Sequence, residues 1–234
     1  MYNQVLAKIA TSMGNTEAEN ARMFGLANAA MGDSGIYSWR DKYDYDLWRP
    51  VVGVREDDVN SVGPSVTDAV AGRSIVPPCD PFWLPLGRPA SNRLGEFSRT
   101  PDFPAYPSGH ATFGAAVLET VRLFYQEKDP TTYSYAVDEE DNIGFTFVSD
   151  ELNGSTLDPD GSRRSRHNRK FDSVAAAMYD NSISRIYLGV HWRFDGTSGY
   201  SVKEMLEATD RIGGVPLGRD IATQIFNGFL QPLP

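Results

Sequence analysis

Three short segments of this chain hold side chains whose types and spacing suit the binding of a tetrahedral oxyanion. They supply cations, histidines and small hydrogen-bond donors: Lys42 and Arg49 in the first, Ser108, Gly109 and His110 in the second, Arg185, His191 and Asp195 in the third. Guanidinium groups pair two oxygens at once, a lysine adds a point charge, and hydroxyl and backbone N–H groups donate short hydrogen bonds. Because the whole chain is acidic, with a net charge of −9, composition alone does not explain this set of cations.

The middle segment, Pro107-Ser108-Gly109-His110, has the pattern of a turn that enters a helix. Such a helix start offers unpaired backbone N–H groups and the positive end of the helix dipole, which together favour an anion. Gly109 would let the backbone approach closely, and His110 would lie beside the anion, where it could transfer a proton. The alternative is a plain capped helix with a partly buried histidine.

The third segment places His191 four residues before Asp195. If a helix continues through both, Asp195 accepts from one imidazole nitrogen and leaves the other as a nucleophile or a metal ligand. The alternative is a surface ion pair. In the first segment Lys42 and Arg49 are two helical turns apart and could point to one side, although the interspersed aspartates also fit a solvated charged face.

Length and composition limit the possible classes of protein. The 234 residues, 41% of them hydrophobic and 23% charged, suit one large or two small globular domains. The acidic balance disfavours nucleic acid as a partner, and no apolar run approaches the ~20 residues of a membrane span. The first residues lack the pattern of a signal peptide, so the compartment stays open, and the single cysteine, Cys79, excludes an internal disulfide.

The pattern along the chain predicts a mostly α protein, a helical bundle with long loops and a small hairpin. Thr16 and Ser108 stand where N-caps belong. Proline-rich residues 64–107 exclude a long helix, and polar residues 138–169 form an excursion with a short strand at 143–148. We expect helices over residues 5–10, 17–31, 33–48, 108–126, 171–187, 202–212 and 220–229.

The combined order Lys-x6-Arg-Pro, Pro-Ser-Gly-His, Ser-Arg-x5-His-x3-Asp resembles the superfamily of type 2 phosphatidate phosphatases and vanadium haloperoxidases. Sequence around the motifs is similar to the chloroperoxidases of that superfamily, so that the resemblance covers nearly the whole chain. The similar stretches are residues 38–42, 103–106, 111–114, 148–154 and 187–192.

The resemblance implies a role for each residue of the three segments. Orthovanadate, or phosphate in its place, would occupy the site, with the metal bound by His191. Asp195 would orient that histidine, and His110 would act as the acid–base catalyst. The remaining groups would neutralise or hydrogen-bond the anion's oxygens: Lys42, Arg49 and Arg185, the Ser108 hydroxyl and the Gly109 N–H.

The implied reaction is the oxidation of chloride or bromide by hydrogen peroxide to hypohalous acid, which then halogenates an organic acceptor. Trp39 and Phe103 would form the halide pocket, where bromoperoxidases carry a histidine at the Phe103 position; core aromatics are the alternative reading of this pair. A soluble acid phosphatase or phosphotransferase with His191 as nucleophile is the alternative function.

Members of this kind are usually longer and carry a pair of helical bundles. Residues 1–234 are expected to form one vanadate-binding domain that resembles the C-terminal bundle. An acidic residue that braces the counterpart of Arg185 would lie before Met1. We therefore also consider a half-built subunit, and expect a homo-oligomer or a partner chain that supplies the other bundle.

Overall fold

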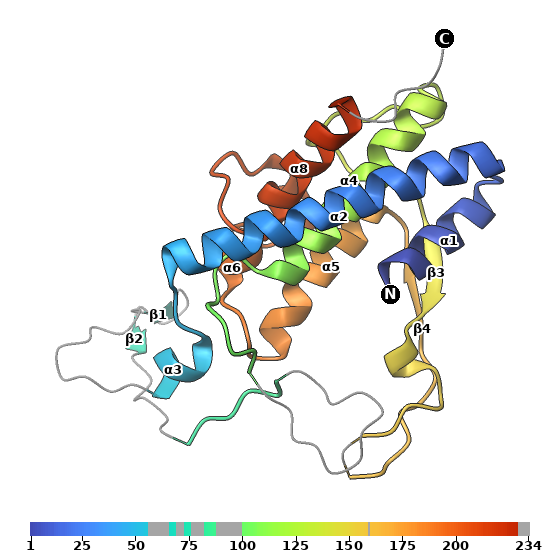
Figure 1. The fold of residues 1–234 in the computed structure, drawn as a ribbon. Coiled ribbons are helices and arrows are strands. Elements are labelled where there is room, and N and C mark those ends of the chain that lie inside the picture. Colours follow the sequence, from blue (N-terminus) through green and yellow to red (C-terminus); the bar gives the residue numbers. More distant parts are fainter. Residues whose placement is uncertain (56–65, 69–72, 76–81, 88–99, 159, 229–234) are drawn as a thin grey trace.

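The structure, a computed structural model, describes residues 1–55, 66–68, 73–75, 82–87, 100–158 and 160–228 (Figure 1). Cys79 and much of the proline-rich loop lie outside these residues. The longer helices are α1 (Tyr2–Ser12), α2 (Glu17–Tyr45), α4 (Gly109–Lys128), α5 (Val174–Tyr187) and α8 (Gly214–Gly228). The shorter ones are α3 (Pro50–Arg55), η1 (Asp150–Leu152), α6 (Arg193–Gly196) and α7 (Val202–Glu207). The mostly α class is thereby confirmed.

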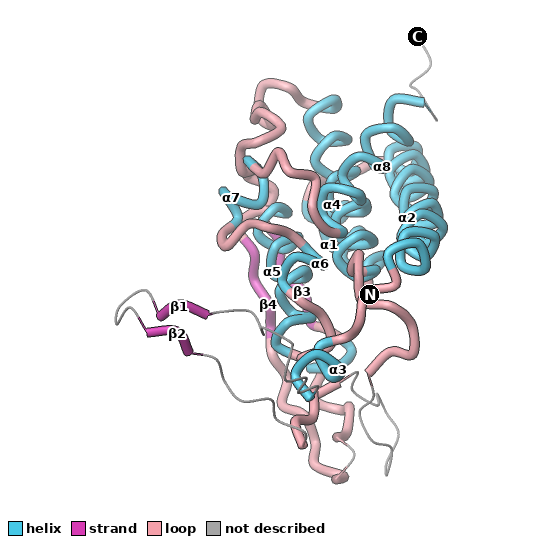
Figure 2. The backbone as a smooth tube through the Cα atoms, turned by 90° about the vertical axis from the view of Figure 1, so that its left-hand side faces the viewer, coloured by secondary structure: helices cyan, strands magenta, loops and turns pink. Residues whose placement is uncertain are grey.

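Helix α4 is the centre of the bundle and packs against α2, α5 and α8, which surround it in Figure 2. Its sequence is apolar on almost every side, and most of its residues are buried, including Ala115, Val117, Val121 and Phe124. A helix that is apolar all round belongs in a core. Ser108 caps its start, as the sequence predicts. The first residues of the central helix are thus held in place by the whole core.

Helix α2 runs unbroken for 29 residues, so the predicted division into helices at 17–31 and 33–48 is wrong. Gly32 lies at the expected break, but a single glycine is tolerated inside a helix. The Thr16 capping box with Glu19 fixes the start, as expected. The helix ends at Tyr45, before Asp46 in the left-handed conformation with φ 45°. Pro50 does not end this helix but begins α3, because proline suits a first helical turn.

The other predicted helices exist with shifted ends. The first extends over Tyr2–Ser12, α5 begins only at Val174, and α7 already ends at Glu207. Helix α8 begins at Gly214, six residues before the predicted start, because Pro216 falls in its first turn, where no N–H is needed.

Two small antiparallel sheets complete the fold. Strands β3 (Phe145–Val148) and β4 (Asn168–Phe171) pair with Phe145 opposite Phe171, and the pair lies beside α1 in Figure 1. This confirms the predicted strand and hairpin. Strands β1 (Val66–Asp68) and β2 (Arg73–Ile75) pair within the proline-rich region, where no strand was predicted. Of the helices in the described ranges, none has the length and apolar character that crossing a membrane requires.

Close packing of α8 on α4 depends on Gly218. A Cβ added there would lie 2.3 Å from the Thr112 carbonyl oxygen and 2.9 Å from the Ala115 Cβ. We predict that Gly218→Ala lowers the free energy of unfolding by about 2 kcal/mol, because the two helices must separate. Gly32→Ala is the matched control: its Cβ would meet open space, so it should stabilise α2 by about 1 kcal/mol. Denaturant titration measures both, and equal effects would contradict the packing argument.

Candidate functional site

The three segments meet at the loop that precedes α4. Lys42, fully buried in the last turn of α2, directs its Nζ at three carbonyl oxygens of this loop. The distances are 3.0 Å to Pro104, 2.9 Å to Ala105 and 2.6 Å to Pro107. An ammonium group has three donors, so these contacts use all of them. Lys42 therefore holds the loop in place.

Arg49 joins the same loop to the third segment. Its Nε donates to the Phe103 carbonyl at 2.9 Å, and its Nη1 donates to the Val190 carbonyl at 2.8 Å and to His191 Nε2 at 2.9 Å. Arg49 lies beyond the end of α2, so the expectation of two helical turns between Lys42 and Arg49 is wrong. The turn at Asp46 brings both cations to one loop instead.

His191 and Asp195 are paired as predicted, although no single helix carries both. Helix α5 ends at Tyr187, Gly189 adopts a φ of 71°, and α6 begins only at Arg193. The turn nevertheless brings His191 Nδ1 to 2.8 Å from Asp195 Oδ2, which also accepts from the Trp192 N–H at 2.9 Å. The predicted pairing holds, but a tight turn provides it.

The contacts of His191 determine its tautomer. Arginine can only donate, so Nε2 must accept from Arg49, and the single imidazole proton must lie on Nδ1, facing Asp195. Burial, followed by the charges of Arg49 and Lys42, holds the pKa of His191 well below its usual range. His191 is therefore neutral, and its Nε2 lone pair faces the cations.

The second segment is tied to the third through the backbone. The Ser108 N–H donates to the Asp195 carbonyl at 2.7 Å, and the buried Ser108 side chain caps α4. Gly109 is the first residue of α4, so its N–H has no acceptor within the helix. A Cβ there would lie 2.9 Å from the Trp39 ring, so a larger residue would have to displace that ring. His110, the next residue, is exposed.

Comparisons with known proteins identify the family of this chain. A family profile described as the VCPO second helical-bundle domain matches residues 22–206. The vanadium chloroperoxidase of Curvularia inaequalis is 37% identical over 289 aligned residues, which cover 100% of this chain and 44% of that protein. The chain belongs to the vanadium haloperoxidase family, as its second helical-bundle domain.

A solved structure shares the fold of this haloperoxidase domain. A bacterial vanadium-dependent iodoperoxidase superposes with a TM-score of 0.59 at 23% identity, covering 98% of this chain and 38% of that one. The chain thus spans less than half the length of both relatives.

The site around His191 carries a local excess of positive charge. Burial and then the charge of Arg49 lower the pKa of Lys42 to about 7, and burial together with Arg185 lowers the pKa of Arg49 to about 10. Asp195 carries the opposing charge, but burial raises its own pKa to about 7. Two buried guanidinium groups and a partly protonated lysine beside one half-ionised carboxyl still leave a positive excess, which favours a bound anion. The donor set therefore fits an oxyanion such as vanadate.

An aromatic wall borders the cations. The Trp39 and Phe103 rings are 4.9 Å apart, and both are half-buried. Lys42 Nζ lies 5.7 Å and 5.5 Å from the two ring centres, and the Arg49 guanidinium lies 5.0 Å from that of Phe103. The two rings are in contact, and neither is fully buried. The halide pocket stays a prediction.

Sequence reasoning missed the groups that hold the cations. These are backbone carbonyls, chiefly those of Phe103, Pro104, Ala105, Pro107 and Val190. A carbonyl has no side-chain signature, so no motif could have revealed it. The dense prolines of this loop were the available signal, because they mark a rigid backbone.

The pKa of Lys42 leads to a prediction about stability and pH. Folded Lys42 loses its proton near pH 7, whereas the unfolded chain keeps it until about pH 10.5, so unfolding takes up a proton between these values. The free energy of unfolding should therefore rise with pH in that window, by at most about 1.4 kcal/mol per pH unit. Lys42→Met should lack this rise in denaturant titrations from pH 7 to 10. Parallel pH profiles for the two proteins would show that Lys42 is charged in both states.

Proposed function

We propose that this domain binds vanadate and forms the reaction centre of a haloperoxidase that oxidises chloride or bromide with hydrogen peroxide. The observation that carries the proposal is the buried excess of positive charge beside the Nε2 lone pair of His191. Family membership supports the same reading. Because the chain covers 44% of its chloroperoxidase relative, the activity of the whole protein is part of the proposal.

Each residue would have a distinct role in the site. His191 would bind the metal through Nε2, which its proton on Nδ1 and the Asp195 carboxyl keep available. Lys42, Arg49 and Arg185 would neutralise the oxygens, and the Ser108 hydroxyl and the Gly109 N–H would complete the cradle. Bound vanadate would supply a Lewis acid that activates hydrogen peroxide for halide oxidation.

Anion binding would redistribute some hydrogen bonds of Arg49 and Lys42. Arg49 Nη1 would release His191 Nε2, and Lys42 would exchange one of its carbonyl partners for the anion. The anion's charge would raise the pKa of Lys42 and keep this lysine protonated at neutral pH. The remaining carbonyl contacts would hold both cations in place beside the anion.

The exposed His110 would move protons at the site. It lies one residue after Gly109 at the N-terminus of α4, and its side chain is accessible to solvent. A histidine that reaches solvent beside a bound anion can pass protons between the anion and water. His110 and the buried His191 therefore divide the work between proton transfer and binding.

The two histidines should respond differently to substitution. Vanadate at a hundredfold excess over its dissociation constant should stabilise the wild-type chain by about 2.7 kcal/mol. His191→Ala should abolish this melting shift, whereas His110→Ala should keep the shift and lose bromide oxidation.

The assays distinguish the proposal from phosphatase activity. Thermal melts with vanadate, bromination assays and hydrolysis of p-nitrophenyl phosphate are run on the same three proteins. Equal loss of binding in both variants would contradict the division of roles. Phosphate ester hydrolysis without any vanadate-dependent bromination would favour the phosphatase alternative.

Phe103→His should shift halide preference away from chloride. Chloride is harder to oxidise than bromide and needs a closely held, desolvated position, which a hydrated imidazole in contact with Trp39 would weaken. We expect the ratio of kcat/KM for chloride to that for bromide to fall about tenfold, at one pH. An unchanged ratio would mean that Phe103 takes no part in halide selection; Phe113→His, at the next ring along Trp39, is the control.

A further inference from the structure

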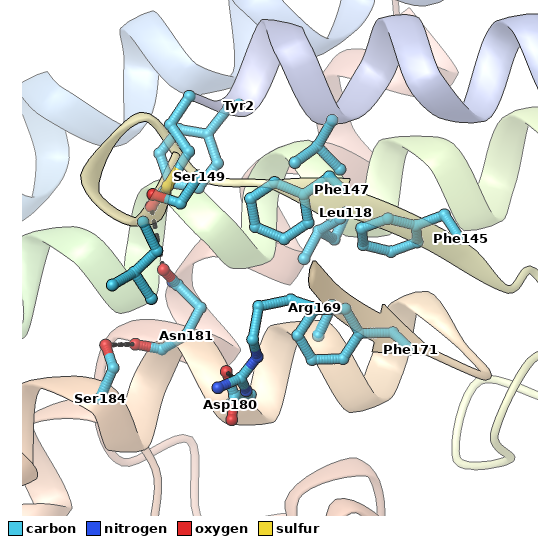
Figure 3. Close-up of a pocket in the computed structure, with 14 residues that line it drawn as sticks. Tyr2, Leu118, Phe145, Phe147, Ser149, Arg169, Phe171, Asp180, Asn181 and Ser184 are labelled. Carbon is cyan, nitrogen blue, oxygen red and sulfur yellow. Dashed lines mark hydrogen bonds and ion pairs between the residues drawn. The ribbon is translucent and has the colours of Figure 1, made fainter. Parts of the chain in front are cut away.

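A second site is suggested by an apolar cavity between α1, the β3–β4 pair and α5 (Figure 3). Its volume is about 220 Å³. Tyr2 from α1, Leu118 from α4, Phe147 and Phe171 from the strands, and Asn181 from α5 line it. No role in the anion site uses these residues.

Strand pairing explains why so many side chains enter this cavity. Side chains alternate along a strand, so Phe145 and Phe147 share one face of β3, and Arg169 and Phe171 share one face of β4. The register places Phe145 opposite Phe171 and Phe147 opposite Arg169. All four therefore lie on the inner face and line the cavity, while Thr146 and Lys170 are exposed on the outer face.

The walls of the cavity are aromatic, and one charged group lies among them. The ring centres of Phe147 and Phe171 are 6.4 Å apart, nearly stacked, and the Arg169 guanidinium lies 5.5 Å from the Phe171 ring centre. Arg169 also pairs with Asp180 at 2.8 Å, and both side chains are about 40% exposed (Figure 3). The cavity thus combines flat apolar walls with hydrogen-bond donors at a solvent-facing edge.

The cavity also adjoins the first turn of α4. Asn181 Nδ2 donates to the His110 carbonyl at 2.8 Å, and the Tyr2 hydroxyl donates to the same oxygen at 3.2 Å. Ser184, another lining residue, directly precedes Arg185 in α5. One layer of side chains therefore separates the cavity from the backbone that carries Gly109 and His110.

We propose that this cavity, beside the first turn of α4, binds the ring of an electron-rich aromatic acceptor, such as a phenol. The proposal rests on the proposed function, because it names the acceptor of that reaction. An apolar cavity of about 150 Å³ is large enough to bind benzene, so the larger volume here admits one substituted ring. The guanidinium of Arg169 would hydrogen-bond the phenol oxygen.

Every atom of the halogenation step is accounted for. A ring carbon of the phenol forms a bond to the halogen of hypohalous acid while the oxygen–halogen bond breaks. The departing hydroxide takes up the proton that the same ring carbon loses, so the products are a halophenol and water. Hypohalous acid, which the proposed reaction supplies, is the oxidant.

Calorimetric titration of the full chain with phenol, in vanadate-free buffer, tests the cavity without any need for activity. Phe147→Ala should weaken binding about tenfold, because one aromatic wall is lost. Arg169→Gln should weaken phenol binding about threefold. This second variant still tests the cavity if Phe147→Ala fails to fold. The matched controls are the outward neighbours on the same strands, Thr146→Ala and Lys170→Gln, which should bind like the wild type.

Two further results separate the cavity from the proposed function. Absence of phenol binding, or equal weakening by the inward variants and their controls, would overturn the cavity proposal even if the chain oxidises bromide. Phenol binding without vanadate-dependent bromide oxidation would overturn the acceptor role together with the proposed function. Support for both requires binding in the cavity and a higher KM for phenol bromination in Arg169→Gln, at an unchanged rate of bromide oxidation.

Discussion

The need to satisfy buried cations governs one end of this bundle. Lys42 and Arg49 donate hydrogen bonds to the carbonyl oxygens of Phe103, Pro104, Ala105, Pro107 and Val190. These bonds fix the loop before α4 and the turn before His191. Without these oxygens the cations would lie unpaired in a low dielectric, at a cost of several kcal/mol each. Two segments far apart in sequence are thereby held against a third by charge and backbone dipoles.

The same interactions define the chemistry of His191. Arg49 faces Nε2 and Asp195 faces Nδ1, so neither imidazole nitrogen is ambiguous. The Asp195 carbonyl in turn accepts from the Ser108 N–H, which links the histidine to the cap of α4. The distance between a ligand bound at Nε2 and the donors at the start of α4 would therefore stay constant. Preorganisation of this kind reduces the entropy lost when an anion binds.

Sequence was most informative where side chains carry the signal. The apolar pattern predicted α4 and its Ser108 cap, and the spacing of His191 and Asp195 predicted their pairing. Lys42 and Arg49 were grouped with that pair through the family resemblance. The local geometry was predicted wrongly. Helical periodicity was expected to bring these side chains together, but turns at Asp46 and Gly189 do so instead. Such turns are determined by tertiary contacts and by backbone carbonyls, for which residue type gives no signal.

Helix α4 is both the axis of the core and the start of the site. It begins directly after the loop that Lys42 holds, while its flanks are closed by α2, α5 and α8. Local fraying of this helix end would require neighbouring helices to part, so its amides should exchange with solvent only through opening of much of the domain. On heating, the candidate site and the helical bundle should therefore unfold in one transition. A state in which the bundle is folded and the site is disordered is not expected.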